Sequence, residues 1–491
     1  MSSTPMTVRL ERWTWAAAIL LGLGAVAFLL WHIARPYPVE ASEPSHILNT
    51  VLFVQGINPY AVPFHPEWLY VYGTLHNAVA YPFALLFGPT FLLHRILSCL
   101  CLLLATGVLY RGMRLDRISP ALAGFGALLF FIHFAFSVTI TAKGNAVAIL
   151  CYLLSVVVPY AGRFRPGSLA AGALFSVLAF YSKGYLALGA PLVSLYLFFF
   201  QSRRLGLLSA AFFGFFLLAS AAVVRHFFPL FLEESVLYQY YWTRAFHDRL
   251  HLFVVMKEVV VVEAALLALL AWGLWRGKKG SVEPFAAFLL AGSFLVYVAV
   301  LSPNKGNGSA YVYHLVLPFL IWAALLVVSR NREALVPRVL LLASVALVAL
   351  FVGRPALQYG HGDHRAAWER VGTLLRAHHD PLCDGSLSES VRAAGLPVYD
   401  NGLTEGLRYV TDNPSVPETR LHKAEARAYC EAMTGKLKAK GFDLLLLYPE
   451  GSPFFPRELI PLYYRKVDSF SLWESFPNDF KSNIEVWEPL P

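Results

Sequence analysis

The chain has 491 residues, of which 57% are hydrophobic and only 14% are charged. A soluble globular protein carries about 25% charged residues, so this composition, with a mean hydropathy of +0.55, excludes an ordinary soluble domain over most of the length. The formal net charge of +9 could indicate a nucleic-acid partner, but the distribution of the charge along the chain indicates a membrane protein instead.

The positive residues gather in short gaps between long apolar runs. Every second gap carries a basic cluster and the gaps between lack one, which is the pattern that the positive-inside rule gives to cytoplasmic loops. About 15 positive residues in six clusters account for the excess charge, so no nucleic-acid partner is needed. The clusters are Arg9/Arg12, Arg111/Arg114/Arg117, Arg163/Arg165, Arg203/Arg204, Arg276/Lys278/Lys279 and Arg330/Arg332/Arg338.

The apolar runs predict about eleven transmembrane helices, because each approaches the length needed to cross the hydrocarbon core. The first run lacks a small-residue cleavage site and is predicted to be a retained helix rather than a signal peptide. An odd number of spans places the N-terminus in the cytoplasm and the C-terminus outside. The predicted spans are 13–33, 89–110, 119–137, 145–162, 168–181, 185–200, 205–224, 252–275, 284–301, 311–329 and 339–353.

From residue 354 the composition changes to that of a soluble domain of about 140 residues. We therefore predict a transmembrane domain over 1–353 and an outer α/β domain over 354–491. Helical patterns cover 364–377 and 424–440, and the second leads into FDLLLLYP, a continuous apolar strand typical of a buried sheet. Cys383 and Cys430 lie in this domain and either form a disulfide or remain free.

The first outer loop, 35–88, holds the carboxylates that are candidates for catalysis. Glu40 and Glu43 are three residues apart, so one helical turn would turn both toward a single cleft. The alternative is that one of them only charges a helix N-terminus. His46 follows Glu43 by three residues and either orients it, binds a phosphate or is structural. Other cleft-wall candidates in this loop are Tyr60, His65 and Tyr72.

Three lone lysines, Lys143, Lys183 and Lys305, fall in short outer turns, where the topology rule disfavours positive charge. We expect them to hold the phosphate of a lipid-linked substrate; the alternative is that they extend to lipid headgroups. His314 begins a span and could reach the same cleft or belong to the interfacial aromatic belt. Lys257, Glu258 and Glu263 either pair with one another or line the cavity, and the sequence leaves both open.

Few acids and several cations at one surface suit sugar transfer from a lipid phosphate. The leaving phosphate is a stable anion, so one carboxylate that deprotonates the acceptor hydroxyl is enough when cations stabilise the phosphate. Glycoside hydrolases, whose leaving group is an alcohol, usually need two carboxylates. On this argument Glu43 is the expected general base and Glu40 the reserve.

The first loop resembles that of the GT-C-fold integral-membrane glycosyltransferases, in particular bacterial relatives of protein mannosyltransferases and aminoarabinose transferases. In that family an Asp-Glu pair follows the first span, and a Gly-x-x-Pro-Tyr motif comes later; here SEPSH at 42–46 and GINPY at 56–60 are similar. Ser42 replaces the first acid of the pair. Further similar segments are 72–75, 86–89, 94–98, 182–184 and 313–315.

The resemblance implies a polyprenyl-phosphate-linked sugar as donor and a lipid, glycan or protein acceptor on the periplasmic side of a bacterial inner membrane. Some relatives bind a divalent metal near the first acid, so metal dependence stays open. Because Ser42 replaces that acid, Glu40 could have taken its role, or the chain could be an inactive scaffold. A transporter or lipid flippase is the alternative from another class, although the chain lacks the repeated halves typical of transporters.

Overall fold

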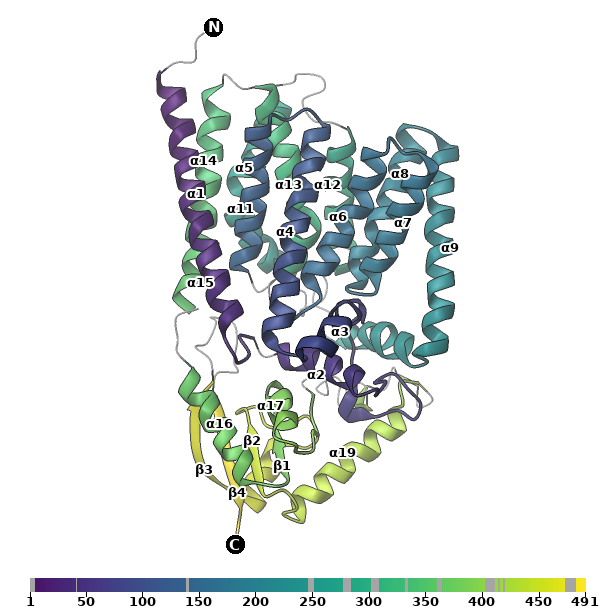
Figure 1. The fold of residues 1–491 in the computed structure, drawn as a ribbon, viewed down its shortest axis with the longest axis vertical. Coiled ribbons are helices and arrows are strands. Elements are labelled where there is room, and N and C mark those ends of the chain that lie inside the picture. Colours follow the sequence, from purple (N-terminus) through teal and green to yellow (C-terminus); the bar gives the residue numbers. More distant parts are fainter. Residues whose placement is uncertain are drawn as a thin grey trace.

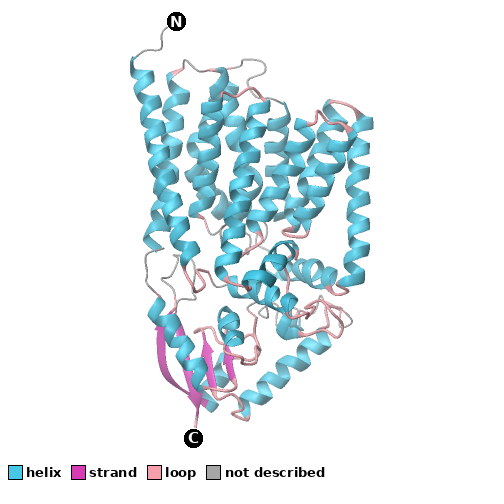
Figure 2. Cartoon of the chain, in the orientation of Figure 1, coloured by secondary structure: helices cyan, strands magenta, loops and turns pink. Residues whose placement is uncertain are grey.

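The computed structural model describes residues 5–40, 42–137, 141–245, 251–276, 284–301, 309–331, 334–359, 364–401, 411–413, 416–417, 420–472 and 483–491. It consists of a large helical bundle with a small α/β domain at one end (Figures 1 and 2). We call the end of the bundle next to this domain the capped end. The N-terminus lies at the opposite end of the molecule (Figure 1).

Within the described residues, eleven helices of the bundle follow the predicted spans, so the prediction of a multi-pass helical membrane protein is confirmed. Six of the described helices are long and apolar enough to cross a membrane unaided. The eleven are α1 (Pro5–Ala34), α4 (Phe91–Leu115), α5 (Pro120–Phe136), α6 (Asn145–Ala161), α7 (Pro166–Phe180), α8 (Gly189–Phe200), α9 (Arg203–Phe227), α11 (His251–Trp275), α12 (Pro284–Val296), α13 (Ser309–Arg330) and α14 (Leu335–Val348).

The centre of the bundle is α13, which is buried along residues 314–328 and packs against α5, α11 and α12. Small residues make room for its large side chains: a Cβ on Gly112 of α4 would lie 2.8 Å from the ring of Trp322. Close approach at small residues is the usual way in which membrane helices pack. The Trp322 indole donates a 2.8 Å hydrogen bond to Asp116, so its one polar group is satisfied.

The first outer loop is more ordered than the sequence suggested. It contains the helices α2 (Glu43–Val54) and α3 (Leu75–Phe87), which lie across the capped end of the bundle (Figure 1). A second crosswise segment, η4 (Glu233–Leu237) and α10 (Tyr238–Ala245), follows α9. Nine of the twelve residues of α2 are buried, because this helix is enclosed between the bundle and the C-terminal domain.

The C-terminal domain has a four-stranded mixed sheet in the order β1-β2-β4-β3. The predicted apolar strand is β2 (Leu444–Leu447), which is buried throughout and pairs in parallel with β1 (Pro381–Cys383). The expected helices are α16 (Arg365–Ala377) and α19 (Lys423–Lys438), and a short α17 (Ser388–Ala393) follows β1. The antiparallel pair β3 (Tyr464–Ser471) and β4 (Asn483–Pro489) was not predicted.

Two further features of the C-terminal domain are its cysteines and the point at which it begins. Cys383 and Cys430, which both belong to the described residues, are not joined by a disulfide, and this decides between the two alternatives that the sequence left. The helix of the last span continues from α14 through η6 (Ala349–Gly353) into α15 (Arg354–Tyr359), so helical structure extends past residue 353, where the sequence predicted the domain boundary.

The C-terminal domain is held to the first outer loop by direct hydrogen bonds. The Asn401 side chain donates to the backbone oxygen of Leu69 at 2.5 Å, and the Ser45 hydroxyl on α2 donates to the backbone oxygen of Asn401. Tyr37 also stacks on Trp368 of α16, with ring centroids 6.2 Å apart. The domain therefore contacts the loop that carries the candidate catalytic residues.

Replacing Gly73 with alanine should destabilise the capped end. A Cβ at this position would lie 2.1 Å from the backbone oxygen of Tyr181, which also accepts a hydrogen bond from Leu75. Since both sides of the contact are backbone, the loop must move away from the turn after α7. We expect a lower melting temperature in detergent, whereas Gly107→Ala, in a helix position with open space around it, should change it little.

Candidate functional site

A cavity of about 920 Å³ opens among the helix ends at the capped end of the bundle. This volume is at the upper end of the range typical of small-molecule sites. Its walls come from the C-terminal end of α5, the N-terminal ends of α6, α11 and α13, the segment after α14, and the turn after α7. Polar residues on the wall are Tyr72, His133, Ser137, Lys143, Asn145, Lys183, Tyr185, Lys257, Glu258, Tyr311, Tyr313 and His314.

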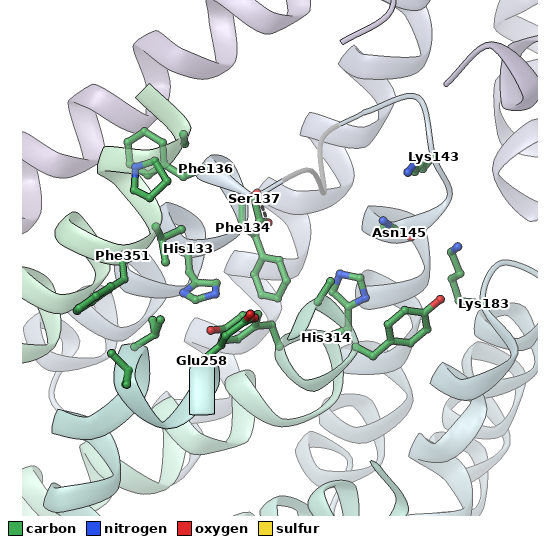
Figure 3. A pocket seen from close by; sticks show the side chains of 18 of the residues that line it. His133, Phe134, Phe136, Ser137, Lys143, Asn145, Lys183, Glu258, His314 and Phe351 are labelled. Carbon is green, nitrogen blue, oxygen red and sulfur yellow. Dashed lines mark hydrogen bonds between the residues drawn. The ribbon is translucent and has the colours of Figure 1, made fainter. Parts of the chain in front are cut away.

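Two of the three predicted lysines lie at one end of this cavity. Lys143 precedes α6 and Lys183 follows α7, and Figure 3 shows both on the same side of the cavity with Asn145 near them. Lys143 forms a 2.5 Å ion pair with Glu40, which also accepts a 2.8 Å hydrogen bond from the Ser42 hydroxyl. About a fifth of the Glu40 side chain is exposed, so it stays accessible beside the cavity.

Lys183 sits over an aromatic face, with Nζ 4.2 Å from the centre of the Tyr72 ring. The pKa of this ammonium group is lowered to about 7, chiefly by burial and also by the charge of Lys143, while Glu40 opposes the shift. A cation–π contact compensates part of the lost hydration. The result is a lysine that changes charge near neutral pH and would gain stability from an anion in the cavity.

His46 does not reach the cavity but supports Tyr72 from behind. The two rings stack with centroids 4.9 Å apart, and His46 Nδ1 lies 2.5 Å from the hydroxyl of Tyr70. Burial lowers the pKa of His46 well below its usual value, and Lys183 and Lys143 lower it further, so the ring is neutral. Of the alternatives that the sequence left for His46, this geometry suits the structural one.

The geometry of Glu43 differs from what a general base needs. Its side chain is fully buried and forms a two-point ion pair with Arg95, at 3.0 Å to Nε and 2.6 Å to Nη2. The same carboxylate accepts hydrogen bonds from the backbone nitrogens of Val39 at 2.7 Å and Ala142 at 2.8 Å. Four donors occupy its oxygens, and it is not among the residues that line the cavity.

This arrangement explains how Glu40 and Lys143 come together. Val39 adjoins Glu40 and Ala142 adjoins Lys143, and Glu43 holds both backbone nitrogens through its two oxygens. The carboxylate therefore joins the start of the first outer loop to the turn before α6. In this geometry Glu43 positions the two segments, and Glu40 is the partly exposed carboxylate that is paired with the cavity residue Lys143.

The remaining predicted residues divide between the cavity and its surroundings. His314 lines the cavity, and its Nδ1 lies 2.7 Å from the hydroxyl of Tyr185. The buried Tyr60 hydroxyl donates to the backbone oxygen of Tyr72 at 3.0 Å, which supports the ring under Lys183 indirectly. His65 pairs with Glu67 at 3.3 Å, away from the cavity. Lys305 lies outside the described residues.

Several residues of the site were not identified from the sequence. Arg95 stood inside a segment singled out only for its family resemblance, and His133 lies in the middle of an apolar run. The signal that could have found Arg95 is a positive charge at the end of a span that the charge pattern predicts to lie outside the cytoplasm, where the rule disfavours it. The sequence left open whether three charged residues of α11 pair with one another or line the cavity. Lys257 and Glu258 line the cavity, whereas Glu263 lies 3.6 Å from His133.

The sequence left open whether the protein binds a divalent metal ion. Among the residues that the structure describes, no group of three or more His, Cys, Asp or Glu side chains is arranged to hold a metal ion. The carboxylate nearest the lysines, Glu40, is instead paired with Lys143. The polar groups at this end of the cavity thus suit an anionic ligand better than a cation.

The overall fold is that of known membrane glycosyltransferases. The chain aligns with the crystal structure of ArnT from Cupriavidus metallidurans bound to undecaprenyl phosphate, with a TM-score of 0.59, 14% identity and coverage of 95% of this chain and 97% of that one. It also aligns with the oligosaccharyltransferase AglB from Archaeoglobus fulgidus in complex with an inhibitory peptide and a dolichol-phosphate, with a TM-score of 0.51, 11% identity and coverage of 94% and 73%.

These two proteins are GT-C membrane glycosyltransferases, so the predicted resemblance to that fold is confirmed. At this low identity the likeness concerns the fold alone. No protein-family model matches the chain, and no curated protein matches it in sequence. The residues that perform a reaction must therefore be argued from this chain's own geometry.

Breaking the Arg95–Glu43 pair should reduce stability more than removing the charge of Glu40. Removal of one partner of a buried ion pair leaves an uncompensated charge, which costs about 3–5 kcal/mol, whereas a partly exposed pair contributes about 0–1 kcal/mol. We expect Arg95→Met and Glu43→Gln to lower the melting temperature clearly and Glu40→Gln to change it little, measured by thermal unfolding in one detergent. Equal melting temperatures for all three variants would contradict the positioning role of Glu43.

Proposed function

We propose that this chain is a glycosyltransferase that moves a sugar from a polyprenyl-phosphate-linked donor to an acceptor at the capped end of the bundle. The observation that carries the proposal is that two lysines line one end of a 920 Å³ cavity in a GT-C fold and that one of them pairs with a partly exposed carboxylate. The similar structures were obtained with undecaprenyl phosphate and with a dolichol-phosphate, which supports the same class of donor here.

In this proposal Lys143 and Lys183 bind the donor phosphate. Two ammonium groups at one end of a partly enclosed cavity attract an anion strongly, because little water screens them. Among the residues that the structure describes, no carboxylate forms an ion pair with Lys183 of the kind that Glu40 forms with Lys143. Asn145 and His314 stand on the lysine side of the cavity (Figure 3), and the Tyr185 hydroxyl lies 2.7 Å from His314 Nδ1. These three side chains offer hydrogen bonds to the phosphate or the sugar.

The proposed reaction needs one general base. We assign this role to Glu40 rather than to Glu43, which the sequence analysis favoured. The acceptor hydroxyl attacks the anomeric carbon of the donor sugar while its proton passes to the Glu40 carboxylate. The bond between the anomeric carbon and the phosphate oxygen breaks, and polyprenyl phosphate leaves with the electron pair. The two lysines stabilise the charge that develops on the phosphate. The sugar, a hexose or a pentose, and the acceptor, a lipid, glycan or protein, are not distinguished by these residues.

The membrane orientation is part of the proposal. The described members of the six basic clusters lie at the helix ends opposite the capped end, which supports a cytoplasmic location for that side. The capped end and the C-terminal domain then face the periplasm of a bacterial inner membrane. Donors on polyprenyl phosphate would reach the cavity from that leaflet.

Glu40→Gln should abolish sugar transfer without unfolding the protein. Loss of a general base typically costs 10²–10⁴-fold in rate. The measurement is lipid and glycan analysis of membranes that contain the variant, in search of a glycan that lacks one sugar. Glu67→Gln is the matched control, because Glu67 is a carboxylate of the same loop that lies away from the cavity.

Full transfer by Glu40→Gln would contradict the proposed base. Lipid movement across the membrane without any sugar transfer would favour the transporter or flippase alternative. A wild-type protein that neither transfers nor transports, yet binds a partner through its C-terminal domain, would favour an inactive scaffold. These three outcomes separate the enzyme from both alternatives.

Binding of undecaprenyl phosphate should depend on the charge of Lys183. Because the pKa of this lysine is about 7, the wild-type protein must take up a proton to bind the phosphate above that pH. A nearby phosphate favours the charged form, so affinity relative to a Lys183→Arg variant should fall by up to about tenfold per pH unit from pH 7 to 9.

The phosphate itself also titrates, and this affects the affinity of both proteins equally. The ratio of the wild-type and Lys183→Arg dissociation constants therefore reports on Lys183 alone. Other charged groups facing Lys183 are Lys143 and Glu40. The measurement is the dissociation constant at several pH values in nanodiscs. A constant ratio between the two proteins over this range would contradict the proposed role of Lys183.

A further inference from the structure

The end of the cavity away from the lysines carries polar groups that the proposed reaction does not use. His133 of α5 and Lys257 and Glu258 of α11 line this part of the wall. Figure 3 shows His133 and Glu258 on the opposite side of the cavity from Lys143 and Lys183, with His314 between the two groups. His133, Lys257 and Glu258 lie on helices whose other side chains are mostly apolar.

His133 is held in a defined orientation. Its Nδ1 lies 3.6 Å from Glu263, and its ring packs on Tyr313 with centroids 4.2 Å apart. His133 and Glu263 are each almost fully buried, and within the described residues neither His133 Nδ1 nor Glu263 Oε1 has a hydrogen-bond partner. Ionisable groups inside membrane spans are costly and mark functional sites, and apolar residues of similar size would be at least as stable here.

The two ends of the cavity differ in charge. The lysine end holds two ammonium groups, whereas at the far end the charges of Lys257 and Glu258 offset each other. A phosphate at the far end would face the Glu258 carboxylate, so it prefers the lysines. What the far end offers is a mixture of hydrogen-bond donors and acceptors beside the Tyr313 ring, and this suits an uncharged ligand with several hydroxyl groups.

We propose that His133, Lys257 and Glu258 form a subsite for the polyhydroxyl ring of a sugar. The inference rests on the proposed transferase function and adds an orientation to it: the phosphate lies at the lysine end and the ring at the His133 end. Glu263 acts as a positioning residue, because it contacts His133 and is not among the residues that line the cavity. The ring belongs either to the donor or to the acceptor, since both carry hydroxyl groups.

The test uses the full chain in nanodiscs and two kinds of probe. Saturation-transfer NMR measures binding of a panel of methyl pyranosides (gluco, galacto, manno, xylo and arabino forms), and a separate titration measures binding of undecaprenyl phosphate. We expect at least one methyl pyranoside to give a signal with the wild-type protein. Glu258→Gln and His133→Ala should each reduce it at least fivefold, while the affinity for undecaprenyl phosphate stays within twofold.

Val261→Ala is the matched control, because Val261 lines the same cavity from the same helix without a polar group. Lys183→Met should show the reverse behaviour, with loss of phosphate binding and retention of the pyranoside signal. Retained undecaprenyl phosphate binding also demonstrates that the His133 and Glu258 variants are folded. Glu258 is exposed to the cavity, so its replacement by glutamine is the milder of the two changes.

Absence of any pyranoside signal with the wild-type protein, or an unchanged signal in both variants, would overturn the subsite and leave the proposed phosphate site standing. If the wild-type protein does not bind undecaprenyl phosphate, that result would instead count against the proposed function. Undecaprenyl-phosphate-glucose then identifies the source of the ring when methyl glucoside binds: competition indicates the donor's sugar, and simultaneous binding indicates the acceptor's. Both results support the subsite.

Discussion

The buried ion pair between Arg95 and Glu43 is the contact on which the site depends. Arg95 also donates from Nη1 to the backbone oxygens of His32 and Arg35 and from Nη2 to that of Tyr37, at 2.7–3.0 Å. One guanidinium group thus binds the end of α1, the start of the first outer loop and the Glu43 carboxylate. The planar group is suited to this, since it offers five donors in fixed directions and stays charged. Without it, three backbone oxygens and a carboxylate would be buried with fewer partners.

The pair also connects the fold to the charge pattern of the cavity. Glu43 neutralises Arg95 away from the cavity, so the charges that remain at the cavity end are those of Glu40, Lys143 and Lys183. Tyr72 separates Lys183 from the neutral His46 behind it, and the turn carrying Lys183 is fixed by the hydrogen bond from Leu75 to Tyr181. The first outer loop therefore supplies both the carboxylate and the surface on which the second lysine rests.

The membrane spans could be predicted because composition and charge alternation are local in the sequence. The same holds for β2, whose four leucines permit little besides a buried strand. The role of Glu43 could not be predicted, because its partner lies 52 residues away on another helix. The spacing of residues in the loop does not distinguish Glu40 from Glu43. Only the tertiary structure buries Glu43 and leaves Glu40 partly exposed. His133 was missed for the same reason: its carboxylate partner, Glu263, lies on α11.

In the proposed reaction the arrival of the donor changes the contacts of Glu40. Lys143 and the Ser42 hydroxyl both contact the same oxygen of this carboxylate, and a phosphate between the two lysines would share the Lys143 ammonium group with it. Sharing the ammonium group weakens its attraction to Glu40. The carboxylate is then freer to accept the proton of the acceptor hydroxyl. The ion pair would in this way couple donor binding to the activation of the acceptor.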